Sequence, residues 1–350
     1  MSLFSGKKLS VEIYGESHAE KIGVSVKGLP RFKFDREELD TFLARRKATL
    51  SVFSTSRIEP DKPVFYGVKD GEISGDFTAE IINENKISKD YAPLYGKPRP
   101  SHADYAWHVK DGALDFSGGG RFSARLTAPL CIVGGILKQY LKQRGIEIES
   151  YVSSVGNINA KSYKDGILSA EEIRKLRVGE FPSLDKKEEL IEEIKSAKIV
   201  GDSVGGTVEC VIYGVKGMGD NLFCGLEGKI SNLVFAVPAV KGVEFGDGFN
   251  LAAMRGSVAN DPLRIENGQV KIVTNRAGGI NGGIANGNPI TLRAAFRPTP
   301  SISLPQKTVD LIKGENTEIV INGRHDACVA VRALPAVESA VAIAIADEIL

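Results

Sequence analysis

The chain has 350 residues, of which 42% are hydrophobic and 25% are charged. This composition is typical of a folded protein with a sizeable core and excludes a disordered chain. The formal charge of +1 at pH 7 excludes a global attraction to nucleic acid or to an anionic membrane. We therefore expect neither as a partner, and any basic site must be a local cluster.

Cysteine usage and the apolar runs of the sequence predict a cytoplasmic protein. The four cysteines lie far apart without a CxxC pair, which indicates free thiols in a reducing compartment. The stretch "MSLFSGKKLSVEIYG" lacks the apolar core of a signal peptide. The longest apolar run, 128–137, is shorter than the roughly 20 residues that span a bilayer.

The first predicted helix covers 35–46. Asp35 is its expected N-cap, and Glu38 stands three residues later, as in a capping box. Arg45 and Arg46 fall in the last turn, where they either complement the helix dipole or bind a ligand. The apolar face of this helix consists of Leu39, Phe42 and Leu43.

A second helix is predicted over 125–143, directly after the glycine-rich stretch "SGGGRFSAR". Its apolar positions keep helical spacing, and Gly145 ends the run. A glycine-rich loop that leads into a helix N-terminus favours anions, because unpaired N–H groups and the helix dipole both attract negative charge. This segment is therefore a candidate anion site.

The rest of the chain mixes helices and strands without a regular βαβ rhythm. We expect helices from Ser169 and from Ser183, and strands over 206–215 and 288–296. The alanine-rich stretch 332–350 predicts a last helix that runs to Leu350 without a cap, as if the chain continued. This order of elements favours the α+β class over a doubly wound sheet.

Three of the four histidines stand in polar or glycine-rich contexts, each with an acid or a base nearby. They are His18, His102 and His325, and they suit proton transfer. A lone histidine can equally be a buried structural residue, and for His18 that alternative stays open at this point. We interpret His108 as structural or exposed.

Arginines recur beside glycine, serine or histidine, and such a set suggests capture of phosphate and carboxylate groups. Taken singly, each could be a surface salt bridge. No metal-ligand spacing, Walker A sequence or Rossmann fingerprint is present, so we expect no metal site. The residues alone predict a pocket for an acidic phosphorylated small molecule. The arginines are Arg45, Arg46, Arg57, Arg99, Arg121, Arg125 and Arg324.

Several segments, in this order, resemble the chorismate synthase family. The three longest are "GESHAEKIGVSVKGLP", "GGGRFSARLTAPLCIVGGIL" and "GRHDACVAVRALPAVESA". The shorter stretches "RPSHADY", "AVKGVEFGDGF", "AGGINGGIANG" and "RPTPSI" match in order and approximate spacing. The resemblance covers nearly the whole chain.

This resemblance implies a lyase that converts 5-enolpyruvylshikimate-3-phosphate to chorismate and phosphate by 1,4-elimination, in the shikimate pathway of aromatic amino acid biosynthesis. It implies reduced FMN as a cofactor that is not consumed, a homotetramer, and one β-α-β layered domain over 1–350. The family is also associated with NADP. No segment is left over for a separate reductase domain, so we expect reduced FMN to come from outside.

The resemblance also assigns roles to residues. It makes His18 the acid that protonates the departing phosphate, His102 the partner of the reduced flavin, and Asp326 a proton relay. The substrate-binding arginines would be Arg46, Arg99, Arg125 and Arg324. The flavin contacts would be Arg121, Phe122, Ser123, Pro238, Ala239, Gly282, Arg297, Pro298, Thr299, Pro300, Ser301 and Arg324.

Four positions depart from the family pattern: Ala19, Val52, Phe122 and Pro238. Two other interpretations therefore remain. An ordinary flavin oxidoreductase would consume its FMN stoichiometrically, and a catalytically silent paralogue would bind ligands without turnover.

Overall fold

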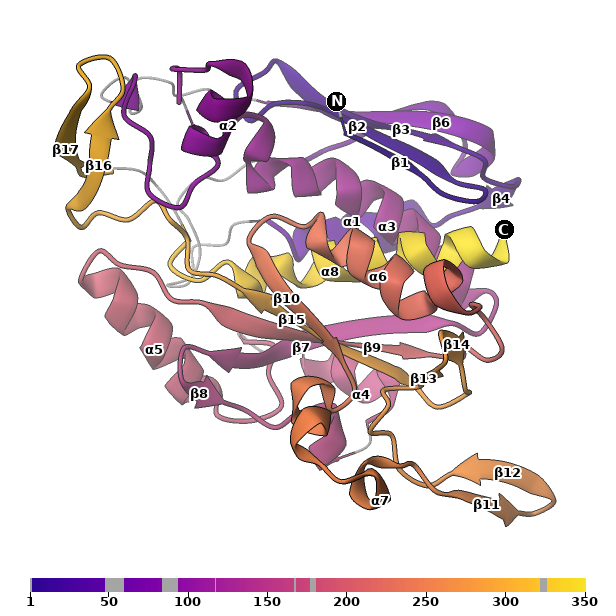
Figure 1. The fold of residues 1–350 in the computed structure, drawn as a ribbon. Helices are drawn as coiled ribbons and strands as arrows, with labels where there is room; N and C mark the ends of the chain where they lie inside the picture. Colours follow the sequence, from indigo (N-terminus) through magenta and orange to yellow (C-terminus); the bar gives the residue numbers. More distant parts are fainter. Residues whose placement is uncertain are drawn as a thin grey trace.

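The computed structural model of the protein describes residues 2–47, 60–83, 94–116, 118–166, 168–176, 181–321 and 326–350. Its elements form three layers, with helices packed between two antiparallel sheets (Figure 1). The α+β class and the β-α-β layering are thereby confirmed, whereas the single domain stays a prediction. Four residues singled out in the sequence lie outside the described residues: Val52, Arg57, Arg324 and His325.

The first sheet has the strand order β1-β2-β3-β6-β4, and β5 also pairs with β6. Alternate apolar side chains of β3 and β6 are buried, for example Val24 opposite Ala79. This period of two turns one face of the sheet toward the helices. The strands are β1 (Ser2–Ser5), β2 (Ser10–Gly15), β3 (Lys21–Lys27), β4 (Phe32–Lys33), β5 (Val64–Lys69) and β6 (Glu72–Ile82).

The second sheet has the order β10-β15-β9-β7-β8. The two predicted strands are confirmed as its neighbours β9 and β15, with Cys210 opposite Leu292. Central helices cover one face of this sheet and α4 and α5 the other, so β9 is buried on both faces (Figure 1). The strands are β7 (Glu147–Val155), β8 (Ile158–Asn159), β9 (Gly206–Tyr213), β10 (Val240–Phe245) and β15 (Ile290–Phe296).

Three small hairpins extend from the layers (Figure 1). The hairpin β16–β17 lies beside α2, and β11–β12 projects at the opposite end of the molecule (Figure 1). These strands are β11 (Leu263–Glu266), β12 (Gln269–Ile272), β13 (Ile280–Asn281), β14 (Ile284–Ala285), β16 (Gln306–Asp310) and β17 (Glu315–Ile319).

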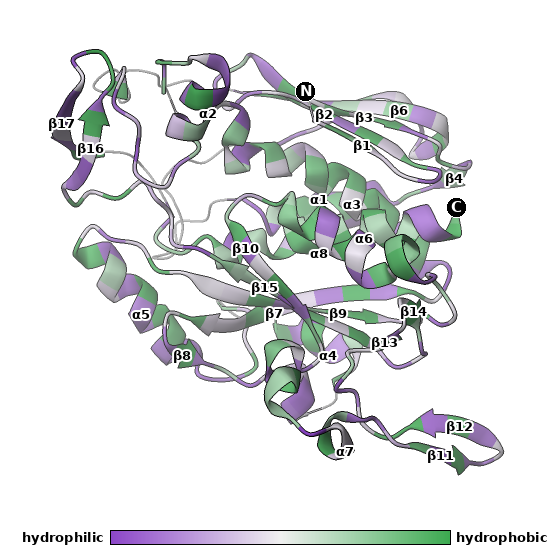
Figure 2. Ribbon diagram, viewed as in Figure 1, coloured by the Kyte–Doolittle hydropathy of each residue, from purple (hydrophilic) through white to green (hydrophobic). Residues whose placement is uncertain are grey.

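The central helices α3 and α8 are apolar on nearly all sides, because they pack on each other and lie between the two sheets (Figure 2). None of the helices in the described ranges combines the length and the apolarity needed to cross a lipid bilayer. The helices are α1 (Arg36–Ala44), α2 (Asp104–Asp111), α3 (Thr127–Lys142), α4 (Ala170–Lys175), α5 (Lys187–Ile199), α6 (Leu226–Phe235), α7 (Gly256–Ala259) and α8 (Ala330–Ile349).

The N-terminus of α1 confirms the predicted cap but not the capping box. The carboxylate of Asp35 accepts hydrogen bonds from the backbone N–H groups of Glu37 (2.7 Å) and Glu38 (3.1 Å). The N–H of Asp35 donates to Gln139 Oε1 of α3 at 2.6 Å, and the Glu38 carboxylate instead accepts from Lys142 at 3.2 Å. A contact between α1 and α3 has therefore replaced the hydrogen bond between the Glu38 carboxylate and the N–H of Asp35 that a capping box requires.

The starts of the later helices follow local chemistry. At α4 the capping box of Ser169 and Glu172 is complete, as the prediction of a helix from Ser169 requires. Helix α5 begins at Lys187, four residues after the predicted start at Ser183. Asp185 uses its carboxylate to accept the backbone N–H of Lys161 at 2.8 Å, and Lys186 has a φ of 49°, so this stretch is not helical.

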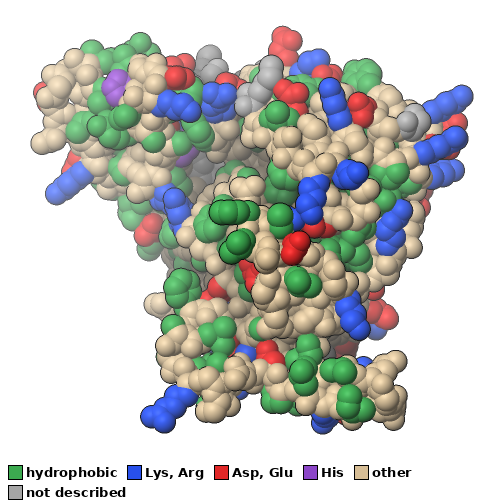
Figure 3. Space-filling model, turned by 45° about the vertical axis from the view of Figure 1, so that its right-hand side comes forward, with side chains coloured by type: hydrophobic (Ala, Val, Ile, Leu, Met, Phe, Trp, Pro, Cys, Tyr) green, Lys and Arg blue, Asp and Glu red, His purple; other side chains and the backbone are tan. Residues whose placement is uncertain are grey.

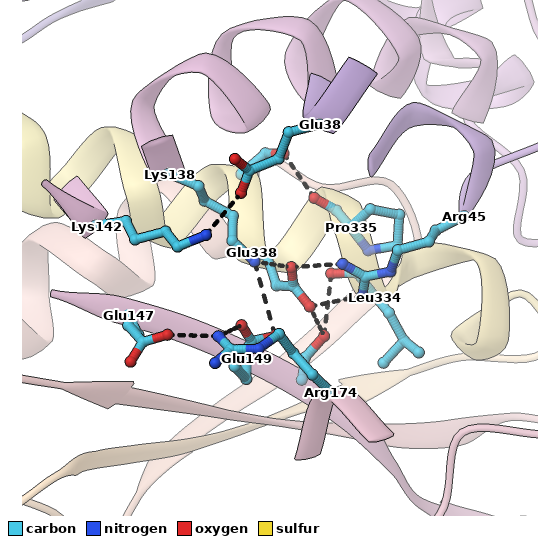
Figure 4. A network of polar contacts seen from close by, with 12 residues as sticks. Glu38, Arg45, Lys138, Lys142, Glu147, Glu149, Arg174, Leu334, Pro335 and Glu338 are labelled. Atoms are coloured by element: carbon cyan, nitrogen blue, oxygen red, sulfur yellow. Dashed lines mark hydrogen bonds and ion pairs between the residues drawn. The ribbon is translucent and has the colours of Figure 1, made fainter. Parts of the chain in front are cut away.

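A buried ion network joins α1, α3 and α8 to β7 (Figure 4). Glu338 of α8 is completely buried and accepts two hydrogen bonds from Arg45, at 2.6 and 2.8 Å. Lys138 of α3 and the hydroxyl of Ser150 of β7 bind the same carboxylate. Arg45 thus belongs to a buried ion network of the core, whereas the next residue, Arg46, has a different partner.

Candidate active site

A cavity of about 750 Å³ lies where the helical layer meets loops from both sheets. Among the described residues of its lining, six are arginines and two are lysines, against two aspartates. The nearly neutral chain therefore concentrates positive charge here, as binding of an anion requires. The lining comes from eight segments, at 17–18, 46–47, 61, 99–106, 119–127, 235–241, 297–301 and 326–336.

His18 lies half-buried in the loop that follows β2 and lines the cavity. The glycine-rich loop before α3 packs against this loop, and the N–H of Ser17 donates to the carbonyl of Gly120 at 3.2 Å. A Cβ added to Gly118 would stand 2.2 Å from His18 Nε2, so only glycine fits beside the ring. His18 therefore faces the cavity, and its catalytic role stays a prediction.

His102 lies in an ion-paired cluster with Arg99 and Asp104. Arg99 donates to the two Asp104 oxygens at 2.7 and 2.8 Å, and His102 Nδ1 lies 2.5 Å from Oδ1. Burial raises the pKa of Asp104, but the hydrogen bonds from Arg99 and His102 outweigh burial and lower this pKa to about 2. Asp104 is therefore a carboxylate at neutral pH.

An ionised Asp104 decides which ring nitrogen of His102 carries the proton. Nδ1 must donate to the carboxylate, which leaves Nε2 to meet a ligand. The 3.1 Å contact between Arg99 Nη2 and His102 Nδ1 follows because both donors converge on one oxygen of Asp104. Arg99 also donates to the carbonyl of Gly118 at 2.5 Å and so links this cluster to the His18 side of the cavity.

A second carboxylate, Asp61, holds two of the predicted substrate arginines. Arg46 Nη2 donates to its Oδ2 and Arg125 Nη1 to its Oδ1. All three side chains are buried, yet all three line the cavity. Burial raises the pKa of Asp61, but the charges of Arg46 and Arg125 outweigh burial, and the net shift is downward.

Asp326 lines the cavity just before α8, and Arg332 of that helix holds its carboxylate. Arg332 Nη1 donates to Asp326 Oδ2 at 2.6 Å, and its Nε donates to the backbone carbonyl of Arg46 at 3.1 Å. One guanidinium thus fixes both the predicted proton relay and the backbone of a predicted substrate arginine.

Aromatic side chains lie beside Arg121 at the edge of the cavity. The Arg121 guanidinium lies 4.8 Å from the centre of the Trp107 ring, and Trp107 meets Phe122 edge to face at 5.5 Å. Phe122 remains substantially exposed. A cation among aromatic faces can take a planar, negatively charged ligand.

Three residues of the cavity lining have strained backbone conformations. Among the described residues, seven other than glycine have a positive φ, and three of the seven line the cavity. These are Asp61 (46°), Ser101 (59°) and Ala239 (74°). Such conformations persist only where the surroundings enforce them, and they are frequent at functional sites.

Most residues that the sequence indicated for the site are brought together here, although their roles stay predictions. Those that line the cavity are His18, His102, Asp326, Arg46, Arg99, Arg125, Arg121, Phe122, Ser123, Pro238, Ala239, Arg297, Thr299, Pro300 and Ser301. Two others do not line it. Pro298 packs toward Gly205, and Gly282 lies in the turn between β13 and β14 with open space around its Cα. Arg324 lies outside the described residues.

Sequence reasoning missed Asp61 and Arg332. Asp61 stands in "EPDKP", a pattern equally typical of a surface loop, so it carried no signal. Arg332 did carry a signal in the sequence. It is a single charge in the apolar stretch "CVAVRALPAV", and such a charge must find a partner when its helix is buried.

Comparisons with known proteins identify the family to which the chain is similar. The family model described as chorismate synthase matches residues 9–350. A chorismate synthase from Thermococcus kodakarensis is 43% identical, covering 99% of this chain and 97% of the relative. One from Lancefieldella parvula is 44% identical, covering 98% and 94%. A crystal structure of a chorismate synthase matches with a TM-score of 0.75 at 25% identity, covering 99% of this chain and 93% of that one.

The family model spans nearly the whole chain, the two relatives exceed 40% identity over almost their full lengths, and the fold matches a solved member. The resemblance inferred from the sequence motifs is thereby confirmed. The chain belongs to the chorismate synthase family, a family of lyases.

Proposed function

We propose that this cavity binds 5-enolpyruvylshikimate-3-phosphate and converts it to chorismate by 1,4-elimination of phosphate, a step of aromatic amino acid biosynthesis. One observation carries the proposal. Two histidines, two aspartates and six arginines from distant segments line a single cavity. A substrate with one phosphate and two carboxylates needs such a concentration of cations, and an elimination needs groups that give and take protons.

The chain's own residues suggest how the protons move. His18 would protonate the departing phosphate, since its ring lines the cavity beside the glycine-rich loop before α3. Asp326, held by Arg332, would relay the proton that the substrate ring loses. Arg46, Arg99 and Arg125 would bind the anionic groups and keep the substrate oriented between these acids and bases.

The residues present also fit reduced FMN. Arg121 and Arg297 supply positive charge for its phosphate, and Phe122, supported by Trp107, offers aromatic surface for its ring. His102, with Nδ1 fixed by Asp104, can present Nε2 to the flavin. When bound, reduced FMN would supply electron density that helps phosphate leave.

Phosphate release from 5-enolpyruvylshikimate-3-phosphate under anaerobic conditions, with and without reduced FMN, tests the proposal. We expect many turnovers for each reduced FMN and none without it. Oxidation of one FMN for each product would instead indicate an ordinary flavin oxidoreductase. Soluble protein without turnover that also fails to complement a strain lacking chorismate synthase would indicate a silent paralogue.

We further propose a cytoplasmic homotetramer that receives reduced FMN, or NADP-dependent reducing power, from outside the chain. Exposed apolar side chains support assembly, because Leu222, Phe223 and Phe249 are almost fully exposed. Apolar side chains also gather at several places on the face that Figure 3 shows. Light scattering after size-exclusion chromatography measures the assembly, and a monomer at micromolar concentration would contradict it.

A further inference from the structure

Asp61 and Asn83 form a polar bridge that includes two arginines of the cavity, Arg46 and Arg125. Each oxygen of Asp61 accepts from a different guanidinium, Arg46 on one side and Arg125 on the other. Arg125 continues the bridge, because its Nε donates to Asn83 Oδ1 at 3.0 Å. Both Asp61 and Asn83 are almost completely buried.

The bridge ends on the loop that carries His18. The side-chain amide of Asn83 donates to the carbonyl of Ala19 at 2.8 Å and to that of Glu16 at 3.4 Å. This orientation of the amide is fixed by chemistry, since a guanidinium can only donate and a carbonyl can only accept. The two arginines and the proposed general acid are therefore held in one frame.

The geometry points to Asp61 and Asn83 as positioning residues. Asp61 sets the spacing and the direction of the guanidinium groups of Arg46 and Arg125, and Asn83 ties that pair to the loop of His18. This inference rests on the proposed function, in which these arginines bind the anionic groups of the substrate. Neither Asp61 nor Asn83 needs to touch the substrate.

An alternative role for Asp61 is that of an internal anion that competes with the substrate. Its side chain is only 3% exposed, and each of its two oxygens is already bound by one of the guanidinium groups, so it serves as their common partner. Its φ of 46° shows a backbone held in the left-handed region by its surroundings. Without this carboxylate the two like charges repel each other and lose their common direction, so positioning predicts weaker substrate binding.

The variant Asp61→Asn tests the inference, because it keeps the shape and removes the charge. We expect KM for 5-enolpyruvylshikimate-3-phosphate to rise roughly ten- to a hundredfold, as when charge-assisted hydrogen bonds are lost, while kcat changes little. An unchanged or lowered KM would overturn the inference, and a lowered value would show competition. The matched control is Asp40→Asn, which removes a carboxylate from an exposed pair with Arg36 and should leave KM unchanged.

A double variant asks whether Asp61 acts through the arginines. In an Arg46→Ala background, Asp61→Asn should raise KM less than it does in the parent, since one of its two partners is already gone. Fully additive effects would contradict a role through Arg46. If Asp61→Asn does not fold, the variant Asn83→Ser tests the inference instead. It should raise KM, because Arg125 loses a hydrogen-bond partner, and lower kcat, because the loop of His18 loses its link to Arg125. If Asn83→Ser has the same KM and kcat as the parent, the proposed role of the bridge is wrong.

A binding measurement separates this inference from the proposed reaction. If the parent shows no turnover at all, the proposed function fails, and inorganic phosphate then serves as the probe. Phosphorus NMR line broadening should show weaker phosphate binding to Asp61→Asn and Asn83→Ser than to the parent and to Asp40→Asn. Equal binding by all four proteins would overturn the positioning role independently of turnover.

Discussion

Gly118 joins the two halves of the candidate active site. Its carbonyl accepts from Arg99, and its Cα faces Nε2 of His18 with no room for a side chain. Its φ of 60° also suits glycine. This one residue therefore sets the distance between the proposed general acid and the cluster around His102.

We expect Gly118→Ala to lower kcat by at least about tenfold, because the new methyl group displaces His18 from a position that proton transfer requires. Gly112→Ala is the matched control: its φ is 69°, but open space surrounds it. Both substitutions strain the backbone by about 1 kcal/mol, so only a steric effect separates their kcat values. Equal kcat values in the two variants would contradict the contact with His18.

The two histidines should differ in what their removal changes. His18→Ala is expected to lower kcat by roughly 10²–10⁴-fold, as loss of a positioned acid does, while substrate still binds. His102→Ala should instead alter the absorbance of bound reduced FMN as pH is varied. Anaerobic absorbance titrations of both variants with substrate present decide between the roles. Identical titrations in the parent and both variants would argue against this division.

Glu209 of β9 makes the stability of the fold depend on pH. It is buried, and burial raises the pKa of its carboxyl to about 7, although the N–H of Tyr163 donates to Oε1 at 3.2 Å. The unfolded chain ionises Glu209 from about pH 4.5, whereas the native state keeps it protonated until about pH 7. The free energy of unfolding therefore falls between these two pH values and levels off above the higher one.

The size of this effect should be on the order of 3 kcal/mol, since one pKa unit corresponds to about 1.4 kcal/mol. Glu209→Gln cannot ionise, so its free energy of unfolding should rise relative to that of the parent as pH increases from about 4.5 to about 7. Urea unfolding of both proteins at several pH values measures the difference. Parallel pH profiles would show that Glu209 has an ordinary pKa.

At the scale of elements, α3 and α8 pack closely together at Gly134. A Cβ at this position would stand 2.1 Å from Ser339 Cβ of α8. Gly134→Ala should therefore destabilise the protein by about 1–3 kcal/mol through overpacking, although alanine is the better helix former. Gly228→Ala in α6 is the control, because open space surrounds it and the same change should be neutral or stabilising. Thermal unfolding of both variants checks the sign, and a stabilised Gly134→Ala would be evidence against close packing.

The elements show which predictions a sequence supports. Periodicity and local capping predicted α4, β9, β15 and the start of α1, because those signals act within a few residues. The partner of Glu38 could not be predicted, since Gln139 and Lys142 come from another helix. Arg45 and Arg46 are adjacent in sequence but diverge in space, one to Glu338 and one to Asp61, and only the packing of distant segments decides this.

The residues of the candidate site also fall into those that the sequence could indicate and those that it could not. His18, His102 and the arginines stand in distinctive local contexts, so the sequence could indicate them. Asp61 and Asn83 were missed because their function depends on partners far along the chain, such as Arg125. Residues that perform chemistry are easier to recognise in a sequence than the residues that hold them in place.

At the scale of the whole molecule, Glu338 holds the layers together. Its buried carboxylate binds Arg45 at the end of α1, Lys138 of α3 and Ser150 of β7 (Figure 4). Glu338→Gln would leave two cations without their counter-charge in the core, a loss typically worth about 3–5 kcal/mol. We expect urea unfolding to show such a loss, whereas Glu192→Gln in the exposed pair with Lys195 should change stability by no more than about 0.5 kcal/mol. Equal effects would mean that solvent already screens the network.

The position of α8 bears on how the chain is made in the cell. This helix follows both sheets in chain order, yet it packs between them (Figure 1). During synthesis, the inward face of the second sheet and one side of α3 must therefore wait for a segment that leaves the ribosome after them. Domains of this size often pass through intermediates that expose apolar surface and aggregate. Nascent chains that stall before Ala330 should consequently be strong clients of chaperones, and release of α8 should end that dependence.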